Sequence, residues 1–230
     1  MNPALGTPVQ LPVGGGLAVY AGPDSPLNKL IGLGFDGPVE EQALARAEAV
    51  FAERGAQLQA EVSTLADVGL HGLLCARGYV ASGFENVLGY PLTLPASAPA
   101  SEISVTRVAP DEHAAFAELM VTAVETPDVG GVGGDATPPS ELIRHWVLAM
   151  LRSPGVSGYL ARIRGELAGA ASMRLDDALA QFTGAATLPA FRRRGVQSAL
   201  LRARLADAAR AGCDVAVVTT QPASKSQHNV

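Results

Sequence analysis

Three consecutive arginines, Arg192 to Arg194, stand directly before Gly195 and an apolar, helix-forming run, and their spacing suits the binding of an anion. If a helix begins near Gly195, the backbone N–H groups from about Arg193 to Gln197 lack partners within the helix and converge on one spot. The positive end of the helix dipole lies there, and a glycine lets a phosphate approach the backbone closely. We therefore expect a phosphate site at this turn. The alternative is a solvated cluster of charge.

The elements around this turn follow from hydrophobic periodicity. In chain order, the sequence predicts a strand (103–108), a helix (110–124), a helix after an N-cap at Ser140, three strands (156–163, 166–175 and 178–188), a helix (196–211) and a buried strand (213–220). Short turns at 164–165 and 176–177 indicate that the three strands form an antiparallel meander. Gly212 is expected to stop the last helix. The Gly- and Pro-rich stretch 127–139 is read as a connector between the first two helices, with a lid over a site as the alternative.

The stretch from Arg192 to Gln197 resembles the acyl-CoA pyrophosphate loop of the GCN5-related N-acetyltransferase (GNAT) family. The family pattern is Arg or Gln, two residues, Gly, one residue, then Gly or Ala. Arg192 and Gly195 match its first two fixed positions, while Gln197 replaces the small residue at the third and still offers a backbone N–H. The element order from 103 to 220, with Pro189 between strand and loop, extends the resemblance. It implies an α/β (α+β) fold with a mixed, mostly antiparallel sheet flanked by helices.

The resemblance implies an N-acetyltransferase that uses acetyl-CoA as cosubstrate. The parallel strands 178–188 and 213–220 would splay apart to hold the pantetheine arm, and a primary amine of a small molecule or a peptide would attack the thioester directly. A backbone N–H on the first of these strands would stabilise the oxyanion. The cofactor-binding residues so implied are Ala186, Thr187, Leu188, Arg192, Arg193, Arg194, Gly195, Val196, Gln197 and Asn229, the last of these at the family's helix-starting Asn.

The catalytic residues are not assigned. The family often places an acidic residue on the first splayed strand, whereas this strand offers Gln181 and Thr183, and Asp177 reads as a turn residue. The family's helix after the second splayed strand often supplies a Tyr, and none follows here. Three aromatic or imidazole side chains are candidates to line an acceptor pocket: Tyr159, His145 and Trp146. A non-catalytic acyl-CoA binding or sensing module is the alternative function.

The Pro-, Ala- and Ser-rich stretch 91–101 suggests a boundary near residue 100. Residues 101–230 would form the acetyl-CoA-binding domain, which lacks the helix and two strands that usually end the family's fold. Residues 1–100 would form a degenerate copy of the same unit, because an offset of 157 positions superposes a helix, a glycine stop and a strand in both halves. Identical pairs at this offset are Val39 and Val196, Leu44 and Leu201, Ala49 and Ala206, Ala52 and Ala209, Gly55 and Gly212, Ala66 and Ala223, and His71 and His228.

The corresponding loop of the first copy is unsuited to a pyrophosphate. Asp36 stands where Arg193 does, and Pro38, which lacks an N–H, stands where Gly195 does. Carboxylates in the first helical turn add repulsion, so the role of the first copy is expected to be structural.

A second pattern in the first copy permits a third reading. Gly32, Gly34 and Gly37 form a GxGxxG motif before a helix, and Glu61 follows near the end of the next strand. Taken literally, these residues indicate an NAD-type dinucleotide-binding protein with a Rossmann fold. The short apolar run before the motif, together with Asp36 and Pro38, argues against it.

Composition sets the remaining limits. A net charge of -5 and a pI near 5.4 argue against a nucleic-acid partner, because such binding rests on neutralising phosphates. Cys75 and Cys213 lie far apart without metal-ligand spacing, so we expect buried free thiols and no metal. The sequence shows no signal peptide and no membrane span, which favours a cytoplasmic protein. A homodimer is left open.

Overall fold

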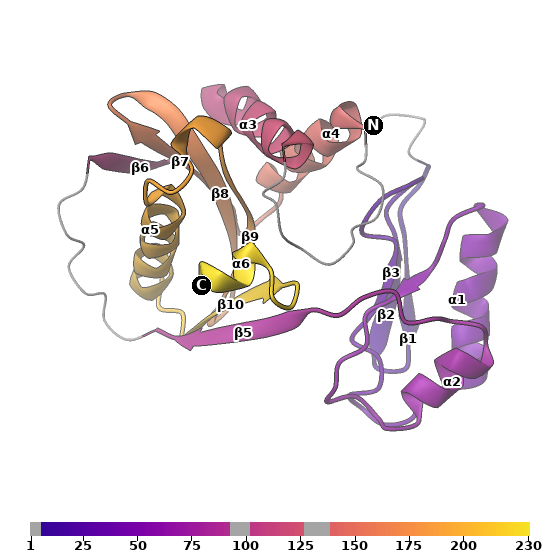
Figure 1. Cartoon of the computed structure of the whole chain (residues 1–230). Coiled ribbons are helices and arrows are strands. Elements are labelled where there is room, and N and C mark those ends of the chain that lie inside the picture. The colour runs from indigo at the N-terminus through magenta and orange to yellow at the C-terminus, as the bar shows by residue number, and fades with distance from the viewer. Residues whose placement is uncertain (1–5, 93–101, 127–138) are drawn as a thin grey trace. The chain divides into compact units, whose positions relative to one another are not determined.

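The computed structural model describes residues 6–92, 102–126 and 139–230, which form two compact units that divide between Ser82 and Gly83 (Figure 1). This division lies earlier than the boundary expected near residue 100. The reason is strand β5 (Asn86–Pro91), which precedes the Pro-rich stretch but is hydrogen-bonded into the sheet of the second unit. By this pairing β5 belongs to the second unit, although it lies before the Pro-rich stretch in the sequence.

The second unit contains a six-stranded sheet in the order β5-β10-β9-β8-β7-β6. After β5 its elements are β6 (Ile103–Arg107), a 3-10 turn (Pro110–Glu112), α3 (His113–Glu125), α4 (Ser140–Leu151), β7 (Val156–Ile163), β8 (Glu166–Asp176), β9 (Leu179–Thr187), a 3-10 turn (Pro189–Phe191), α5 (Val196–Arg210), β10 (Val215–Thr220) and α6 (Lys225–His228). The predicted order from 103 to 220 is confirmed, as is the antiparallel meander of β7, β8 and β9.

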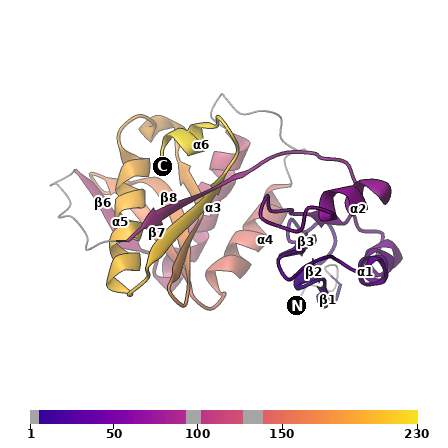
Figure 2. The same cartoon turned by 90° about the horizontal axis from the view of Figure 1, so that it is seen from below.

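Helices cover both faces of this sheet (Figures 1 and 2). Helix α5 buries Val196, Leu200 and Ala208 against one face, and α3 and α4 bury a separate apolar cluster against the other. All strand pairs in the sheet are antiparallel except β9 and β10, which run parallel with α5 as the crossover. The expected mixed α+β fold is confirmed, with β9 and β10 as the one parallel pair of this sheet.

A polar network centred on the buried Asp207 joins α5 to strands β6 and β7 at one edge of the sheet. The hydroxyl of Tyr159 donates to Oδ2 of Asp207 at 2.8 Å, and Nε of Arg107 donates to the same oxygen at 2.7 Å. Arg210 pairs with the other carboxylate oxygen at 2.6 Å. Burial acts to raise the pKa of Asp207, but the hydrogen bonds from Arg107 and Tyr159 outweigh it, so the pKa lies below its usual value. Asp207 is thus held as a carboxylate that joins β6, β7 and α5.

The first unit follows the same strand path with a smaller sheet, in the order β1-β2-β3-β4. Its elements are β1 (Val9–Val13), β2 (Gly16–Tyr20), β3 (Lys29–Ile31), α1 (Glu41–Glu53), β4 (Gln59–Ala60) and α2 (Leu70–Ala76). Two antiparallel pairs are followed by a helix and a parallel pair, as in β7, β8, β9, α5 and β10. The Rossmann reading of Gly32, Gly34 and Gly37 is wrong, because the sheet that holds the motif is mostly antiparallel: only β3 and β4 pair in parallel, whereas a Rossmann fold has a mostly parallel sheet.

The helices α1 and α5 also end in the same way. Gly55 and Gly212 follow them in the left-handed conformation, with φ of +60° and +84°. In each case the next residue donates its N–H to a carbonyl of the last helical turn: Ala56 to Phe51 at 3.0 Å and Cys213 to Ala208 at 3.1 Å. The expected glycine stop at Gly212 is confirmed, and the helix stop recurs at the offset of 157 positions.

Candidate functional site

The parallel strands β9 and β10 separate partway along their length. Their pairing runs from Leu179 and Val215 to Phe182 and Val218 and ends there, although β9 continues to Thr187. The expected divergence of the two strands is confirmed. It leaves the last part of β9 without β10 as a partner, beside the loop that leads to α5.

A β-bulge lies at the point of separation. Ala171 of β8 faces Ala185 of β9, but Met173 faces Phe182, so β9 holds an extra residue opposite Ser172. A bulge of this kind bends its strand and disrupts the local ladder. The bend coincides with the last residue of β9 that pairs with β10.

The hydrogen-bond pattern shows which backbone groups of β9 turn toward the opening. The N–H of Leu188 donates to the carbonyl of Ala168 at 3.0 Å, so Leu188 faces β8. Because backbone groups alternate along a strand, Ala186 also faces β8, whereas Ala185 and Thr187 turn their N–H and C=O groups away from it. Of the three residues expected to contact a pantetheine arm through the backbone, only Thr187 is oriented toward the opening.

The turn after β9 has the geometry expected of an anion site. Gly195 is the N-cap of α5 with φ +82°, and Arg193 is also left-handed, with φ +60°. The first intrahelical bond runs from Ala199 N–H to the Gly195 carbonyl at 3.0 Å, which leaves the N–H groups of the first turn without helical acceptors. That turn, which includes Val196 and Gln197, contains no acidic residue.

The first turn of α5 packs closely against the sheet, beside the part of β9 that no longer pairs with β10. A Cβ at Gly169 of β8 would lie 2.5 Å from Cγ1 of Val196 and 2.8 Å from the carbonyl oxygen of Ala186. Only glycine fits at such a distance. Gly169 therefore allows the buried Val196 to fix the first turn of α5 against β8 and β9.

The three arginines of the loop have different surroundings. The guanidinium of Arg192 donates to the carbonyl of Thr126, at the end of α3. That of Arg194 lies 5.4 Å from the centroid of the Phe191 ring, and Arg193 is exposed. The triplet is thus not a uniform solvated cluster, since two of its members are held by neighbouring groups.

Asn229 lies at the C-terminal end of a short helix. Helix α6 begins after Ser224, whose hydroxyl accepts from the N–H of Gln227, and Asn229 caps its C-terminal end. The assignment of Asn229 to the family's helix-starting Asn, with a contact to the CoA arm, stays a prediction.

The candidate acceptor-pocket residues are not brought together. Tyr159 is 2% exposed and bonded to Asp207 on the α5 side of the sheet, so its role is structural. His145 is exposed on α4, and Trp146 is half-buried there. Asp177 has φ +48° in the β8–β9 turn, which confirms that it is a turn residue.

The split strands hold hydroxyl groups that sequence reasoning did not assign. Thr183, at the bulge, lies 2.6 Å through Oγ1 from Oγ of the buried Ser172. Thr220, at the end of β10, is 4% exposed, and its Oγ1 has no hydrogen-bond partner among the described residues. In the sequence Thr183 is one of two polar residues within a strand and Thr220 ends an apolar strand, and threonines are common at both kinds of position.

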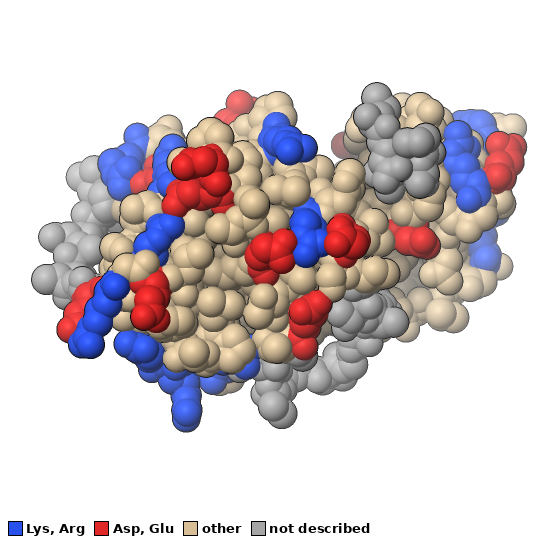
Figure 3. All heavy atoms as spheres, turned by 90° about the horizontal axis from the view of Figure 1, so that it is seen from above, with Lys and Arg blue, Asp and Glu red and all other residues tan. Residues whose placement is uncertain are grey.

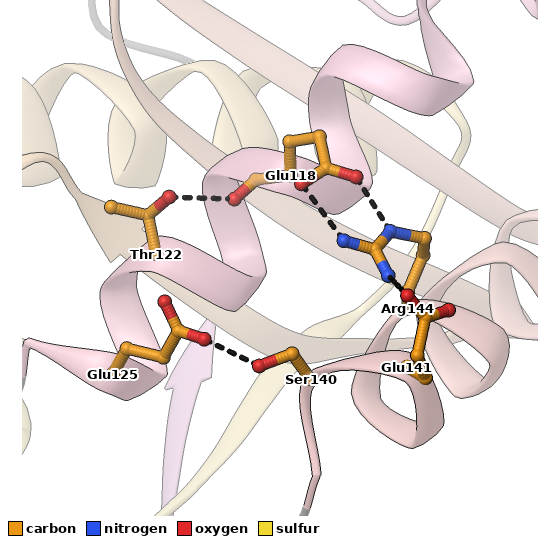
Figure 4. A network of polar contacts seen from close by, with 6 residues as sticks. All are labelled: Glu118, Thr122, Glu125, Ser140, Glu141 and Arg144. Carbon is orange, nitrogen blue, oxygen red and sulfur yellow. Dashed lines mark hydrogen bonds and ion pairs between the residues drawn. The ribbon is translucent and has the colours of Figure 1, made fainter.

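Helices α3 and α4 are tied together by a charged network (Figure 4). The guanidinium of Arg144 donates to both carboxylate oxygens of Glu118, at 2.5 and 3.0 Å, and pairs with Glu141 at 2.7 Å. The hydrogen bonds from Arg144 lower the pKa of the Glu118 carboxyl. This network fixes the helix pair on both sides of the 127–138 segment, which lies outside the described residues.

A second contact joins the same helices. The hydroxyl of Ser140, expected as an N-cap, donates to Glu125, and Pro139 holds the cap position. The side of the molecule on which α3 and α4 lie shows acidic and basic groups interspersed and no broad field of one sign (Figure 3). Surface charge there does not single out an acceptor.

The corresponding loop of the first unit lines a cavity of about 230 Å³ between the β1–β2 turn and the start of α1. Its lining residues include Asp36, Pro38 and Glu40. Carboxylates at this position are repelled by a phosphate, so the cavity is unsuited to a nucleotide diphosphate.

The described residues contain no group of three or more His, Cys, Asp or Glu side chains placed to hold a metal. Both cysteines are free; Cys213 is buried, whereas Cys75 is exposed on α2, so the expectation of two buried thiols is wrong for Cys75. None of the described helices is long and apolar enough to cross a membrane.

The second unit thus combines a sheet whose parallel strands separate, a helix that starts beside the separation, and helices on both faces, as expected of the N-acetyltransferase fold. Residues 120–230, all within the second unit, match the model described as the acetyltransferase (GNAT) family. Among curated proteins, none matches the sequence.

Solved structures agree with this fold. A GCN5-related N-acetyltransferase from Kribbella flavida is 19% identical over 93% of this chain and 80% of its own, with a TM-score of 0.65. A GCN5-related N-acetyltransferase from Sphaerobacter thermophilus is 17% identical over 80% of this chain and 59% of its own, with a TM-score of 0.57. The likeness to the first extends over both units.

Proposed function

We propose that the protein transfers an acetyl group from acetyl-CoA to a primary amine of a small molecule or a peptide. The observation that carries this proposal is the separation of β9 from β10 directly beside the acid-free start of α5 and its arginines. The match of residues 120–230 to the GNAT family supports acetyl transfer as the reaction.

The second unit offers a distinct partner for each part of acetyl-CoA. The N–H groups at Val196 and Gln197, with the charges of Arg192 to Arg194, suit the diphosphate. The outward-turned backbone of Thr187 suits the amides of the pantetheine arm. In the reaction the amine nitrogen bonds to the acetyl carbon, the C–S bond breaks, and the proton lost by the amine balances the thiolate that leaves.

The contribution of the protein to the rate is then mainly positioning, since no carboxylate is placed on the first splayed strand beyond its turn. Thr183 is the polar side chain of β9 nearest the separation, and its hydroxyl is already oriented by Ser172. We place the reacting atoms near this pair of hydroxyls, with the amine entering from the side of α3 and α4.

Release of free thiol from acetyl-CoA in the presence of a panel of amines tests the activity. Thiol release that depends on an amine supports the proposal. Tight CoA binding by calorimetry without turnover on any amine would favour a non-catalytic binding or sensing module, for which the absence of a family-type strand carboxylate is the supporting observation.

A substitution at Thr220, whose Oγ1 has no hydrogen-bond partner among the described residues, tests whether this side chain contacts the cosubstrate. An unpartnered buried donor costs about 1–3 kcal/mol, so Thr220→Val is expected to raise the melting temperature of the free protein. Thr220 shares the α5 side of β10 with Ala216 and Val218, beside the opening, so the same change is expected to reduce the stabilisation by added CoA. Thr219→Val, on the exposed face of the strand, is the control. An undiminished CoA-induced shift in Thr220→Val would contradict a contact with the arm.

The charge argument at the helix start predicts effects of opposite sign for Gln197→Glu. A carboxylate in the first turn interacts favourably with the helix dipole, so thermal stability is expected to rise by about 0.3–1 kcal/mol. The same carboxylate repels a diphosphate, so the Kd for CoA is expected to rise about tenfold or more. Denaturation and calorimetry measure the two effects. A variant that is more stable and binds CoA as tightly as wild type would show that the diphosphate lies elsewhere.

We also propose that the first unit, together with the chain up to about residue 100, is a degenerate copy of the second with a structural role. Its strand path, its helix stop and the offset of 157 positions support a common origin. Its acidic cavity supports the loss of nucleotide binding.

A further inference from the structure

The buried guanidinium of Arg204 is the feature of the second unit that neither the core nor the anion site explains. Arg204 lies on the apolar side of α5 and is 2% exposed. No described carboxylate forms an ion pair with it, and burial lowers its pKa to about 10. A buried charge is costly unless its hydrogen bonds are satisfied, so its contacts indicate why it is placed there.

The contacts of Arg204 outside α5 lie at the β-bulge. Nη1 of Arg204 donates to the carbonyl of Ser172 on β8 at 3.1 Å and to that of Thr183 on β9 at 3.4 Å. The guanidinium also lies 4.5 Å from the centroid of the Phe182 ring. Nε donates to the carbonyl of Leu200, one turn earlier on α5.

The two strand carbonyls belong to residues at the bulge, where the register of β8 and β9 shifts and a regular ladder is interrupted. Register is regular on both sides of Ser172, and the extra residue of β9 stands opposite it. Carbonyl groups buried without donors would disfavour the bulge, and a guanidinium supplies several donors in a fixed plane. Phe182 is also the last residue of β9 that pairs with β10. Arg204 therefore contacts β9 at the point where β9 and β10 separate.

We propose that Arg204 is a positioning residue for the acetyl-CoA site, because it holds the bulge that parts β9 from β10 and turns the edge at Thr187 toward the pantetheine arm. This inference rests on the proposed function. It connects two parts of the site through one helix: the first turn of α5 faces the diphosphate, and Arg204, two turns later, sets the course of the strand that faces the arm.

The test compares Arg204→Met, which removes the donors and the charge, with Arg204→Lys, which keeps the charge but loses the planar fork. Arg202→Met, on the exposed side of the same helix, is the matched control. Calorimetry gives the Kd for CoA, steady-state kinetics give KM for acetyl-CoA and for the amine, and hydrogen exchange reports on the amides of 183–187.

For Arg204→Met we expect the Kd for CoA and the KM for acetyl-CoA to rise about tenfold or more, since misplacement of a binding edge by about 1 Å has effects of this size. Exchange should quicken at 183–187 more than elsewhere in the second unit. Arg204→Lys should recover part of the affinity, and Arg202→Met should match wild type.

A purely structural role gives a different pattern: a lower melting temperature, fewer binding-competent molecules, and an unchanged Kd for those that remain folded. That result would overturn the inference. If Arg204→Met fails to fold, Arg204→Lys decides, and a wild-type Kd with wild-type exchange at 183–187 would overturn it. If wild-type protein binds no CoA, the proposed function fails, while the exchange data still show whether Arg204 holds the bulge.

Discussion

Replacement of Arg192 and Arg194 together by glutamate is expected to weaken CoA binding by at least about 100-fold, because each charge-assisted contact contributes roughly 1.5–3 kcal/mol and reversal adds repulsion. Arg192 also donates to the carbonyl of Thr126, so its loss frees the loop from the end of α3. Calorimetry with CoA measures the effect. The wild-type Kd should rise with salt concentration more steeply than that of the variant, since fewer favourable charges remain to be screened.

The matched control is Arg152→Glu with Arg164→Glu, two exposed arginines of the same unit whose reversal changes the net charge equally. This control should bind CoA nearly as wild type does. Equal losses in both double variants would mean that only overall charge matters. Full binding by the Arg192 and Arg194 variant would remove the electrostatic basis of the site.

Asp207→Ala is expected to destabilise the second unit by about 3 kcal/mol, because the buried hydroxyl of Tyr159 loses its acceptor and Arg107 and Arg210 lose their counter-charge. Urea denaturation of the variant measures this. The exposed carboxylate variant Asp176→Ala should change stability little. Tyr159→Phe should cost less than Asp207→Ala, and the double variant less than the sum, since the two changes remove one shared contact.

The pH dependence follows from the lowered pKa of Asp207. Its contribution to stability is complete above the unfolded-state pKa of about 3.9 and is lost as the pH falls through the lower folded-state value. The difference between wild type and Asp207→Ala should therefore narrow as the pH drops below about 4. A constant difference down to the acid transition would mean that the carboxylate is not the group that holds the network.

Local patterns predicted the elements of the second unit because their causes are local. Helical spacing identified α3, α4 and α5, and the turn residues between strands gave the meander. Gly212 in the left-handed conformation ends α5 where a glycine stop was expected. The loop of Arg192 to Gly195 was likewise found from residue types alone.

The features that determine the site in detail depend on contacts distant in sequence. The bulge at Thr183 arises because β9 holds one residue more than β8 between two stretches of regular pairing. Nothing in the sequence of either strand alone marks this extra residue. Arg204 did leave a signal, since it interrupts the apolar stripe formed by Val196, Leu200 and Ala208, but a charge at such a position is ordinarily read as solvated. Its meaning appears only when the carbonyls at the bulge lie opposite it.

The pairing of β5 with β10 has a consequence for any shortened form of this protein. The family match starts at residue 120, yet β10 has its second neighbour only because Asn86 to Pro91 precede the domain in the chain. A fragment that begins at β6 would present the N–H and C=O groups of an apolar strand to solvent, a template for self-association. The β5–β10 pair joins the first and last strands of the second unit. This pair can therefore form only after nearly all of that unit has been synthesised.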